Sequence, residues 1–158
     1  MSIRGSVNTS PSGLAIAYLI MTIAVLWVSV KIDFLFGLPF VESPLLLVLG
    51  LAVIAVGFAF RYSALRRLLS LERSIQWQHV PRTLVEDGVF RYSRNPAYLG
   101  ILFMLLGAFL FGINWPMLVV LVAVFTLLNR QASVEERVLT EQFGESYLSY
   151  KKKTRRWL

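Results

Sequence analysis

Long uncharged stretches alternate with short charged clusters along the chain, and this pattern predicts its helices. Residues 5–30, 43–60 and 95–129 carry no charged side chain. As one helix the third stretch would be about 52 Å long, whereas the hydrocarbon core of a bilayer is about 30 Å thick. The third stretch must therefore turn back. The sequence from Gly112 to Pro116 offers turn-forming residues followed by a proline that suits the start of a helix.

The uncharged stretches predict four membrane spans. We expect them at residues 14–30, 45–60, 97–112 and 115–129, the last two forming a helical hairpin. The first span lacks the compact basic start and the cleavage site of a signal peptide, so we expect it to be retained.

Two charged segments, residues 61–80 and 133–150, repeat apolar side chains at helical spacing. They are expected to form amphipathic helices at the membrane surface. The predicted fold is therefore all-α: one domain over residues 1–158, with four transmembrane helices plus cytoplasmic interfacial helices.

Composition supports a membrane protein. Of 158 residues, 56% are hydrophobic and 16% charged, against about 25% charged in a typical soluble domain. Such a chain is not disordered, and its continuous apolar stretches are not the alternating strands of a transmembrane barrel. There is no cysteine, and His79 is the one histidine. These counts exclude disulfides, cysteine metal sites and multi-histidine metal sites, so no metal is expected.

The formal net charge of +7 is unevenly distributed along the chain. Residues 61–94 hold seven arginines, and the segment after residue 129 holds seven more cations. The opposite side of the predicted topology offers Lys31. The positive-inside rule then places both basic segments and both termini in the cytoplasm. We expect the partner to be the lipid bilayer with its anionic headgroups. We expect no nucleic acid, and no obligate protein partner is evident.

The stretch from Arg91 to Gly100 is a first candidate for chemistry. Pro96 suits the first turn of a helix, and Asn95 is then its expected N-cap. A helix N-terminus at the membrane surface, next to Arg91 and Arg94, favours an anion. The alternative is a capped helix start with arginines that extend to the headgroups.

A pair of adjacent carboxylates, Glu135 and Glu136, is the second candidate. They could hold a cationic or hydroxylated ligand, but like charges this close need partners, and Arg130 and Arg137 are near in sequence. The alternative is structural, because Ser133 and Glu136 have the spacing of a capping box.

Taken together, the motifs resemble a known family over roughly residues 81–158. In order, the chain reads Arg94-Asn95-Pro96-x-Tyr98-x-Gly100, an apolar hairpin, Glu135-Glu136-x-x-Leu139, Phe143-Gly144-x-x-Tyr147-x-x-Tyr150 and a basic end with Arg156-Trp157. This order resembles the isoprenylcysteine carboxyl methyltransferase and phospholipid methyltransferase superfamily of integral membrane enzymes.

The resemblance implies a cytoplasmic S-adenosylmethionine site and methyl transfer to a lipophilic or small hydrophobic acceptor. The implied cofactor-binding residues are Arg94, Asn95, Pro96, Tyr98, Gly100, Glu135 and Glu136. Arg94, Glu135 and Glu136 are the implied catalytic residues. Many family members carry histidine where this chain has Asn95. Asparagine does not titrate near neutral pH, which argues against proton transfer at this position.

Three other interpretations of the sequence stay open. The chain could be a phospholipid amine N-methyltransferase, or a membrane reductase with a nicotinamide cofactor, since sterol reductases share a similar C-terminal region. It could also be a membrane scaffold without activity, in which the two glutamates only cap a helix.

Overall fold

The computed structural model describes residues 11–37, 43–71, 83–111, 113 and 115–158. Its elements are α1 (Pro11–Phe36), α2 (Pro44–Leu71), the 3-10 helix η1 (Gly88–Arg91), α3 (Pro96–Leu110), α4 (Trp115–Phe143) and α5 (Glu145–Lys153). The described residues form helices and connecting turns, so the predicted all-α class is confirmed.

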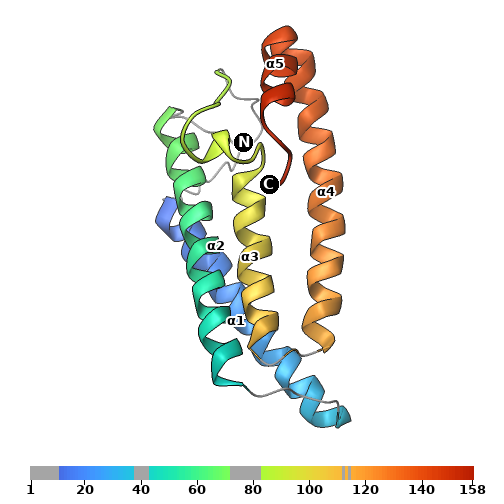
Figure 1. The fold of residues 1–158 in the computed structure, drawn as a ribbon. Helices are drawn as coiled ribbons and strands as arrows, with labels where there is room; N and C mark the ends of the chain where they lie inside the picture. The colour runs from blue at the N-terminus through green and yellow to red at the C-terminus, as the bar shows by residue number, and fades with distance from the viewer. Residues whose placement is uncertain (1–10, 38–42, 72–82, 112, 114) are drawn as a thin grey trace, which may run out of the picture.

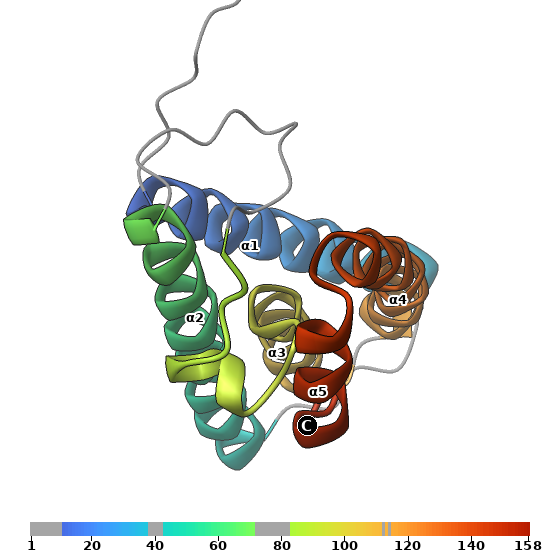
Figure 2. The same ribbon diagram turned by 90° about the horizontal axis from the view of Figure 1, so that it is seen from above.

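The four longer helices run alternately up and down, and α3 lies in the middle of the bundle (Figures 1 and 2). Helices α1, α2 and α4 surround α3 (Figure 2), and α5 contacts α4. Buried apolar side chains of α3 make most of the core, which consists of Ile101, Met104, Leu105 and Ala108 with Met117 of α4. The packing of these side chains against their neighbours holds the short helix in place.

Helices α2 and α3 approach each other backbone to backbone through two pairs of glycines. A Cβ atom on Gly57 would lie 2.7 Å from the Gly100 carbonyl oxygen, and one on Gly50 would lie 2.6 Å from the Gly107 carbonyl oxygen. Small residues allow this close contact, which is a common way for helices to associate in a membrane. We call these four residues the glycine seam.

Three of the described helices are long and apolar enough to cross a membrane. The segments are Leu19–Phe36 in α1, Pro44–Ser70 in α2 and Trp115–Phe143 in α4. Helix α3 is apolar but has 15 residues, which corresponds to about 22 Å. The expected reversal in the third uncharged stretch is confirmed, because α3 ends at Leu110 and α4 begins at Trp115.

The expected separate interfacial helices are not what the structure has. Residues 61–71 continue α2, while residues 72–82, with His79, lie outside the described part. Residues 133–143 likewise continue α4. No glycine or proline occurs between Pro116 and Gly144, and charged side chains alone do not end a helix. The break comes at Gly144, whose φ is +51°, and α5 follows it.

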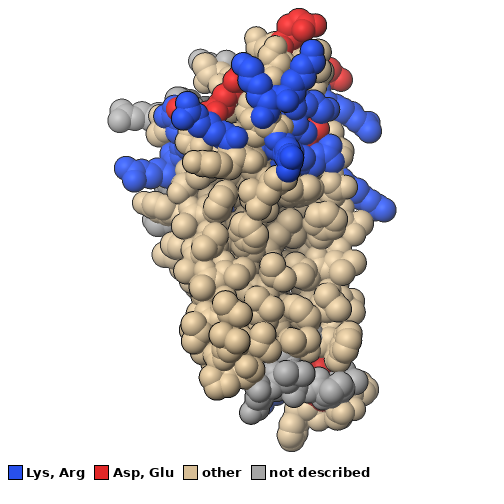
Figure 3. Space-filling model, viewed as in Figure 1, with Lys and Arg blue, Asp and Glu red and all other residues tan. Residues whose placement is uncertain are grey.

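Most of the lysine and arginine side chains visible in Figure 3 gather at one end of the bundle. We call this the basic end: there α2 finishes, η1 leads into α3, and α4 gives way to α5. The described parts of the two basic segments of the sequence meet at this end.

Candidate functional site

A hydrogen bond between a backbone N–H group and the Ser93 side chain stabilises the segment before α3. Asn95 occupies the N-cap position and Pro96 the first turn, as expected, but the Asn95 side chain makes no capping hydrogen bond. Instead, the Asn95 backbone N–H donates to Ser93 Oγ at 3.1 Å. The Nδ2 group of Asn95 is buried and has no hydrogen-bond acceptor among the described residues.

Residues 154–158, the C-terminal tail, dock against this segment. The backbone N–H of Arg94 donates to the Arg155 carbonyl at 2.9 Å. Ser93 Oγ donates to the Arg156 carbonyl at 2.8 Å. Nearby, the buried Tyr150 hydroxyl of α5 donates to the Phe90 carbonyl in η1 at 2.7 Å. Segments about 60 positions apart in sequence thus form one structure at the start of α3.

Glu136 is the centre of a group of ion pairs that we call the carboxylate cage. Its side chain is 5% exposed. Arg94 Nη2 lies 2.9 Å and Arg156 Nε 2.8 Å from Oε1, while Arg156 Nη2 lies 3.0 Å and Lys151 Nζ 3.4 Å from Oε2. Because a buried charge is costly without partners, these three cations allow Glu136 to stay ionised inside the protein.

The two arginines of the cage also bind other groups. Arg94 Nη1 donates to the carbonyls of Lys151 at 3.0 Å and Thr154 at 2.7 Å, while its Nε is buried with no acceptor among the described residues. Arg156 Nη1 donates to Asn129 Oδ1 at 3.0 Å and Ser133 Oγ at 3.1 Å. Arg156 was not among the site residues predicted from the sequence, and its one signal was its place at the end of the motif series.

Glu135, the neighbouring carboxylate, has a different environment. It is half-buried, and its Oε1 accepts hydrogen bonds from the Tyr98 hydroxyl of α3 and from Gln131 Nε2 at 3.1 Å. Among the described residues, no cation lies within ion-pair distance of Glu135. This carboxylate therefore links α3 to α4 through a neutral phenol and keeps acceptor capacity.

Two structural interpretations from the sequence are wrong. Ser133 does not cap a helix, because it lies inside α4 and its Oγ donates to the Asn129 carbonyl at 2.9 Å. Arg130 and Arg137 do not neutralise the glutamate pair. The ion-pair partners of Glu136 come instead from the start of α3, from α5 and from the tail, because the fold brings those distant segments together.

Not all seven candidate cofactor residues have the same surroundings. Arg94, Asn95, Tyr98, Glu135 and Glu136 gather where the start of α3 meets α4, through the Arg94–Glu136 and Tyr98–Glu135 contacts. Pro96 is fully buried in the first turn of α3. Gly100 faces α2, where an added Cβ would lie 2.6 Å from the Gly57 carbonyl oxygen.

Tyr147 of α5 is buried beside the cage and is 1% exposed. Burial, followed by the negative charge of Glu136, raises the pKa of this phenol to about 12. At neutral pH Tyr147 is therefore a neutral phenol, and it interacts with the Arg94 side chain of the cage.

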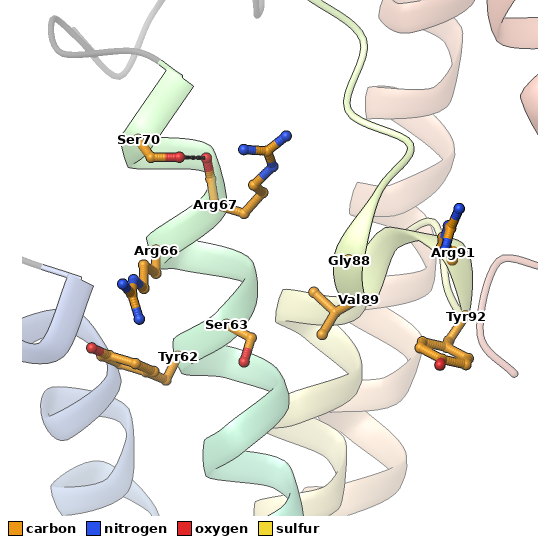
Figure 4. Close-up of a pocket in the computed structure, with 9 residues that line it drawn as sticks. All are labelled: Tyr62, Ser63, Arg66, Arg67, Ser70, Gly88, Val89, Arg91 and Tyr92. Atoms are coloured by element: carbon orange, nitrogen blue, oxygen red, sulfur yellow. Dashed lines mark hydrogen bonds between the residues drawn. The ribbon is translucent and has the colours of Figure 1, made fainter.

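A cavity of about 660 Å³ opens at the basic end, between α2 and η1 (Figure 4). Its lining residues are Tyr62, Ser63, Arg66, Arg67, Ser70, Gly88, Val89, Arg91 and Tyr92. Tyr62 and Arg66 lie on the side of α2 away from η1, whereas Ser63 and Val89 lie between the two elements. This cavity is cationic but also contains apolar and aromatic surface.

A second cavity, of about 670 Å³, adjoins the first and shares Arg67 and Arg91 with it. Between them Arg67 makes a bidentate pair with Asp87, in which Nε lies 2.8 Å from Oδ1. Neither cavity is lined by Glu135 or Glu136. The cavities and the carboxylates are therefore neighbouring features of the basic end.

Comparison with known proteins gives a family match and two relatives. A family model described as phospholipid methyltransferase matches residues 45–146, which is more than half of the chain. The protein-S-isoprenylcysteine O-methyltransferase of Saccharomyces cerevisiae is 37% identical over 71 residues, covering 44% of this chain and 30% of that protein. The protein of the same name from Schizosaccharomyces pombe is 28% identical over 107 residues, covering 63% of this chain and 45% of that protein. The chain thus spans less than half the length of these curated relatives.

Proposed function

Because the chain belongs to the phospholipid methyltransferase family, we propose that it transfers a methyl group from S-adenosylmethionine to a lipophilic acceptor. The observation that carries this proposal is a pair of buried donors at the start of α3. Asn95 Nδ2 and Arg94 Nε have no acceptor among the described residues. A buried donor without an acceptor costs about 1–3 kcal/mol, and a bound carboxylate, carbonyl or ring nitrogen would remove that cost.

The side chains around these donors suit the polar groups of S-adenosylmethionine. Glu135 is half-buried and accepts hydrogen bonds from neutral groups, so it would accept from the cofactor's ammonium or ribose hydroxyls. The cofactor's carboxylate or adenine nitrogens would accept from Asn95 and Arg94. Tyr98, hydrogen-bonded to Glu135, would orient that carboxylate, while Pro96 and Gly100 would set the position of α3.

When bound, S-adenosylmethionine supplies an electrophilic methyl group on a sulfonium. The chain's own residues would hold this donor, orient it toward the acceptor and keep water out. A carboxylate, thiolate or free amine acceptor needs no strong base, which agrees with an asparagine at position 95 and a neutral Tyr147. Orientation alone can lower such a barrier by about 7–11 kcal/mol in favourable cases.

The acceptor would approach from the membrane, along the basic end. The cavity between α2 and η1 combines tyrosines and a valine with arginines, which suits a molecule with an apolar body and an anionic group. The names of the two relatives favour an isoprenylated carboxylate, and the family description favours a phospholipid amine. Assays with a farnesylated cysteine derivative and with phosphatidylethanolamine vesicles, run side by side, would distinguish these acceptors.

In the proposed topology α3 also crosses the membrane, which gives four crossings together with α1, α2 and α4. Both termini then lie in the cytoplasm. The cations gathered at one end support it through the positive-inside rule. Tags at the two ends should be accessible from one side of the membrane and a tag between residues 36 and 40 from the other. Cytoplasmic access to the 36–40 tag would contradict this topology.

Calorimetric titration with S-adenosylhomocysteine tests the proposed cofactor site. Glu135→Gln should weaken binding by about 10- to 150-fold, the loss expected for a charged hydrogen-bond partner. Glu141→Gln is the matched control, since it removes the same charge from an exposed position of α4 and should leave affinity within about twofold of wild type. A wild-type protein that binds no S-adenosylhomocysteine, or that binds reduced nicotinamide cofactor instead, would refute the proposal.

A further inference from the structure

We infer that Arg156 and Glu136 are positioning residues: together they orient Arg94 for a cofactor that neither of them touches. This inference rests on the proposed function and divides the Glu135–Glu136 pair into two roles. Glu135 would face the ligand, and Glu136 would serve the protein's own cations. The two glutamates therefore differ in role, although the motif suggests that they act alike.

Glu136 has no acceptor capacity left for a ligand. A carboxylate offers about four lone-pair sites. Oε1 of Glu136 faces Arg94 Nη2 and Arg156 Nε, while Oε2 faces Arg156 Nη2 and Lys151 Nζ, all between 2.8 and 3.4 Å. A cofactor ammonium would have to displace one of these cations from a side chain that is 5% exposed.

Arg156 joins three parts of the chain. Its guanidinium binds Glu136 through two nitrogens and reaches Asn129 and Ser133, earlier in α4, through the third. Its carbonyl accepts a hydrogen bond from Ser93, next to Arg94. Only a planar fork can make this set of contacts, so lysine is a poor substitute.

The cage fixes the orientation of Arg94. Glu136 and two carbonyls, of Lys151 and Thr154, bind both terminal nitrogens of Arg94. The Nε group is left without an acceptor among the described residues, in a side chain that is 9% exposed. Glu136 therefore sets the direction of the Arg94 guanidinium, and a change in the cage would rotate the donor intended for the ligand.

Affinity for S-adenosylhomocysteine, measured well below the unfolding temperature of each variant, tests this role. Arg156→Gln should weaken binding by about 10-fold or more. The loss of affinity in Arg156→Lys should differ from that loss by no more than about threefold, because lysine lacks the planar fork. The matched control is Arg155→Gln, which removes the same charge from the adjacent, exposed position. It should stay within about twofold of wild type.

A second control separates positioning from general loosening of the tail. Tyr150→Phe removes the buried hydrogen bond to Phe90 and should lower thermal stability without altering the cage. It should leave affinity within about threefold of wild type. If Tyr150→Phe weakens binding as much as Arg156→Gln does, the role of Arg156 is merely structural and the inference is wrong.

A double-mutant cycle then separates positioning from direct contact. If Glu136 and Arg156 act as one unit, the double variant Glu136→Gln with Arg156→Gln should bind within about threefold of the weaker single variant. If Glu136 contacts the cofactor itself, the two losses should multiply, and the inference fails. Equal binding by wild type and Arg156→Gln would overturn the inference but leave the proposed function intact. A wild type that does not bind overturns both.

Discussion

Two contacts position α3 through different interactions, one by close packing of backbones and the other by buried ion pairs. The glycine seam holds α3 to α2 by close backbone contact at four glycines. The carboxylate cage fixes the start of α3 to α4, α5 and the tail through one buried acid and three cations. A larger side chain at the seam should destabilise the fold, and so should the loss of a charged side chain from the cage. Together they position a 15-residue helix whose first turn borders the proposed cofactor site.

The largest expected effect is at the cage. Glu136→Ala leaves Arg94 and Arg156 close together without their shared acid. We expect the free energy of unfolding to fall by about 3 kcal/mol, the lower part of the range for breaking a buried ion pair, because the Arg156 side chain is 27% exposed. Denaturation in detergent micelles measures this value, with Glu141→Ala as the exposed control. An equal, small effect of both variants would mean that the cage does not stabilise the fold.

The seam should respond to the addition of a single methyl group. In Gly100→Ala the new Cβ would meet the Gly57 carbonyl at 2.6 Å and the Arg61 backbone nitrogen at 2.8 Å. Overpacking of this kind costs about 1–3 kcal/mol. Ala59→Val, on the exposed face of α2, should change stability by no more than about 0.5 kcal/mol. Equal denaturation midpoints for the two variants would contradict the close contact of α2 and α3.

A smaller effect is expected outside the cage, at the contact between α5 and η1. Tyr150→Phe removes one buried hydrogen bond, from the hydroxyl to the Phe90 carbonyl, and should cost about 0.5–1.5 kcal/mol. Hydrogen exchange should then be faster in η1 and α5 but unchanged along the seam. Faster exchange in the seam would show that the two regions are coupled.

The smallest effect is expected at the exposed Arg67–Asp87 pair. The hydrogen bond from Arg67 lowers the pKa of Asp87, so any stabilisation is present near neutral pH and is lost as the pH falls through the lowered pKa. Asp87→Asn should therefore change stability little at neutral pH, and the difference from wild type should vanish in acid. A large difference that grows in acid would contradict the assigned direction.

The elements that form the seam were within reach of sequence reasoning, and most of the cage was not. The uncharged stretches predicted helices at the positions of α1 to α4, and the reversal before Trp115 was visible in turn-forming residues. The glycines at positions 50, 57, 100 and 107 have equal spacing within two apolar stretches. That spacing is compatible with close helix contact, but it does not say which two helices meet.

The cage depends on contacts between residues far apart in sequence. Arg94 and Glu136 are 42 positions apart, and Arg156 is another 20 further on, so local spacing pointed to Arg130 and Arg137 instead. The helix boundary expected near residue 130 was wrong for a related reason. A change from apolar to charged side chains marks the end of a hydrophobic stretch, but α4 continues to Phe143.

Hydrogen exchange of the wild-type protein with saturating S-adenosylhomocysteine tests the proposed methyl-donor site most directly. We expect added protection at the start of α3, around residues 93–98, and in the part of α4 around residues 133–136. We expect none in the seam around Gly50 and Gly107, and none with reduced nicotinamide cofactor. Protection absent from the start of α3, or produced equally by the nicotinamide, would contradict a methyl-donor site at the basic end.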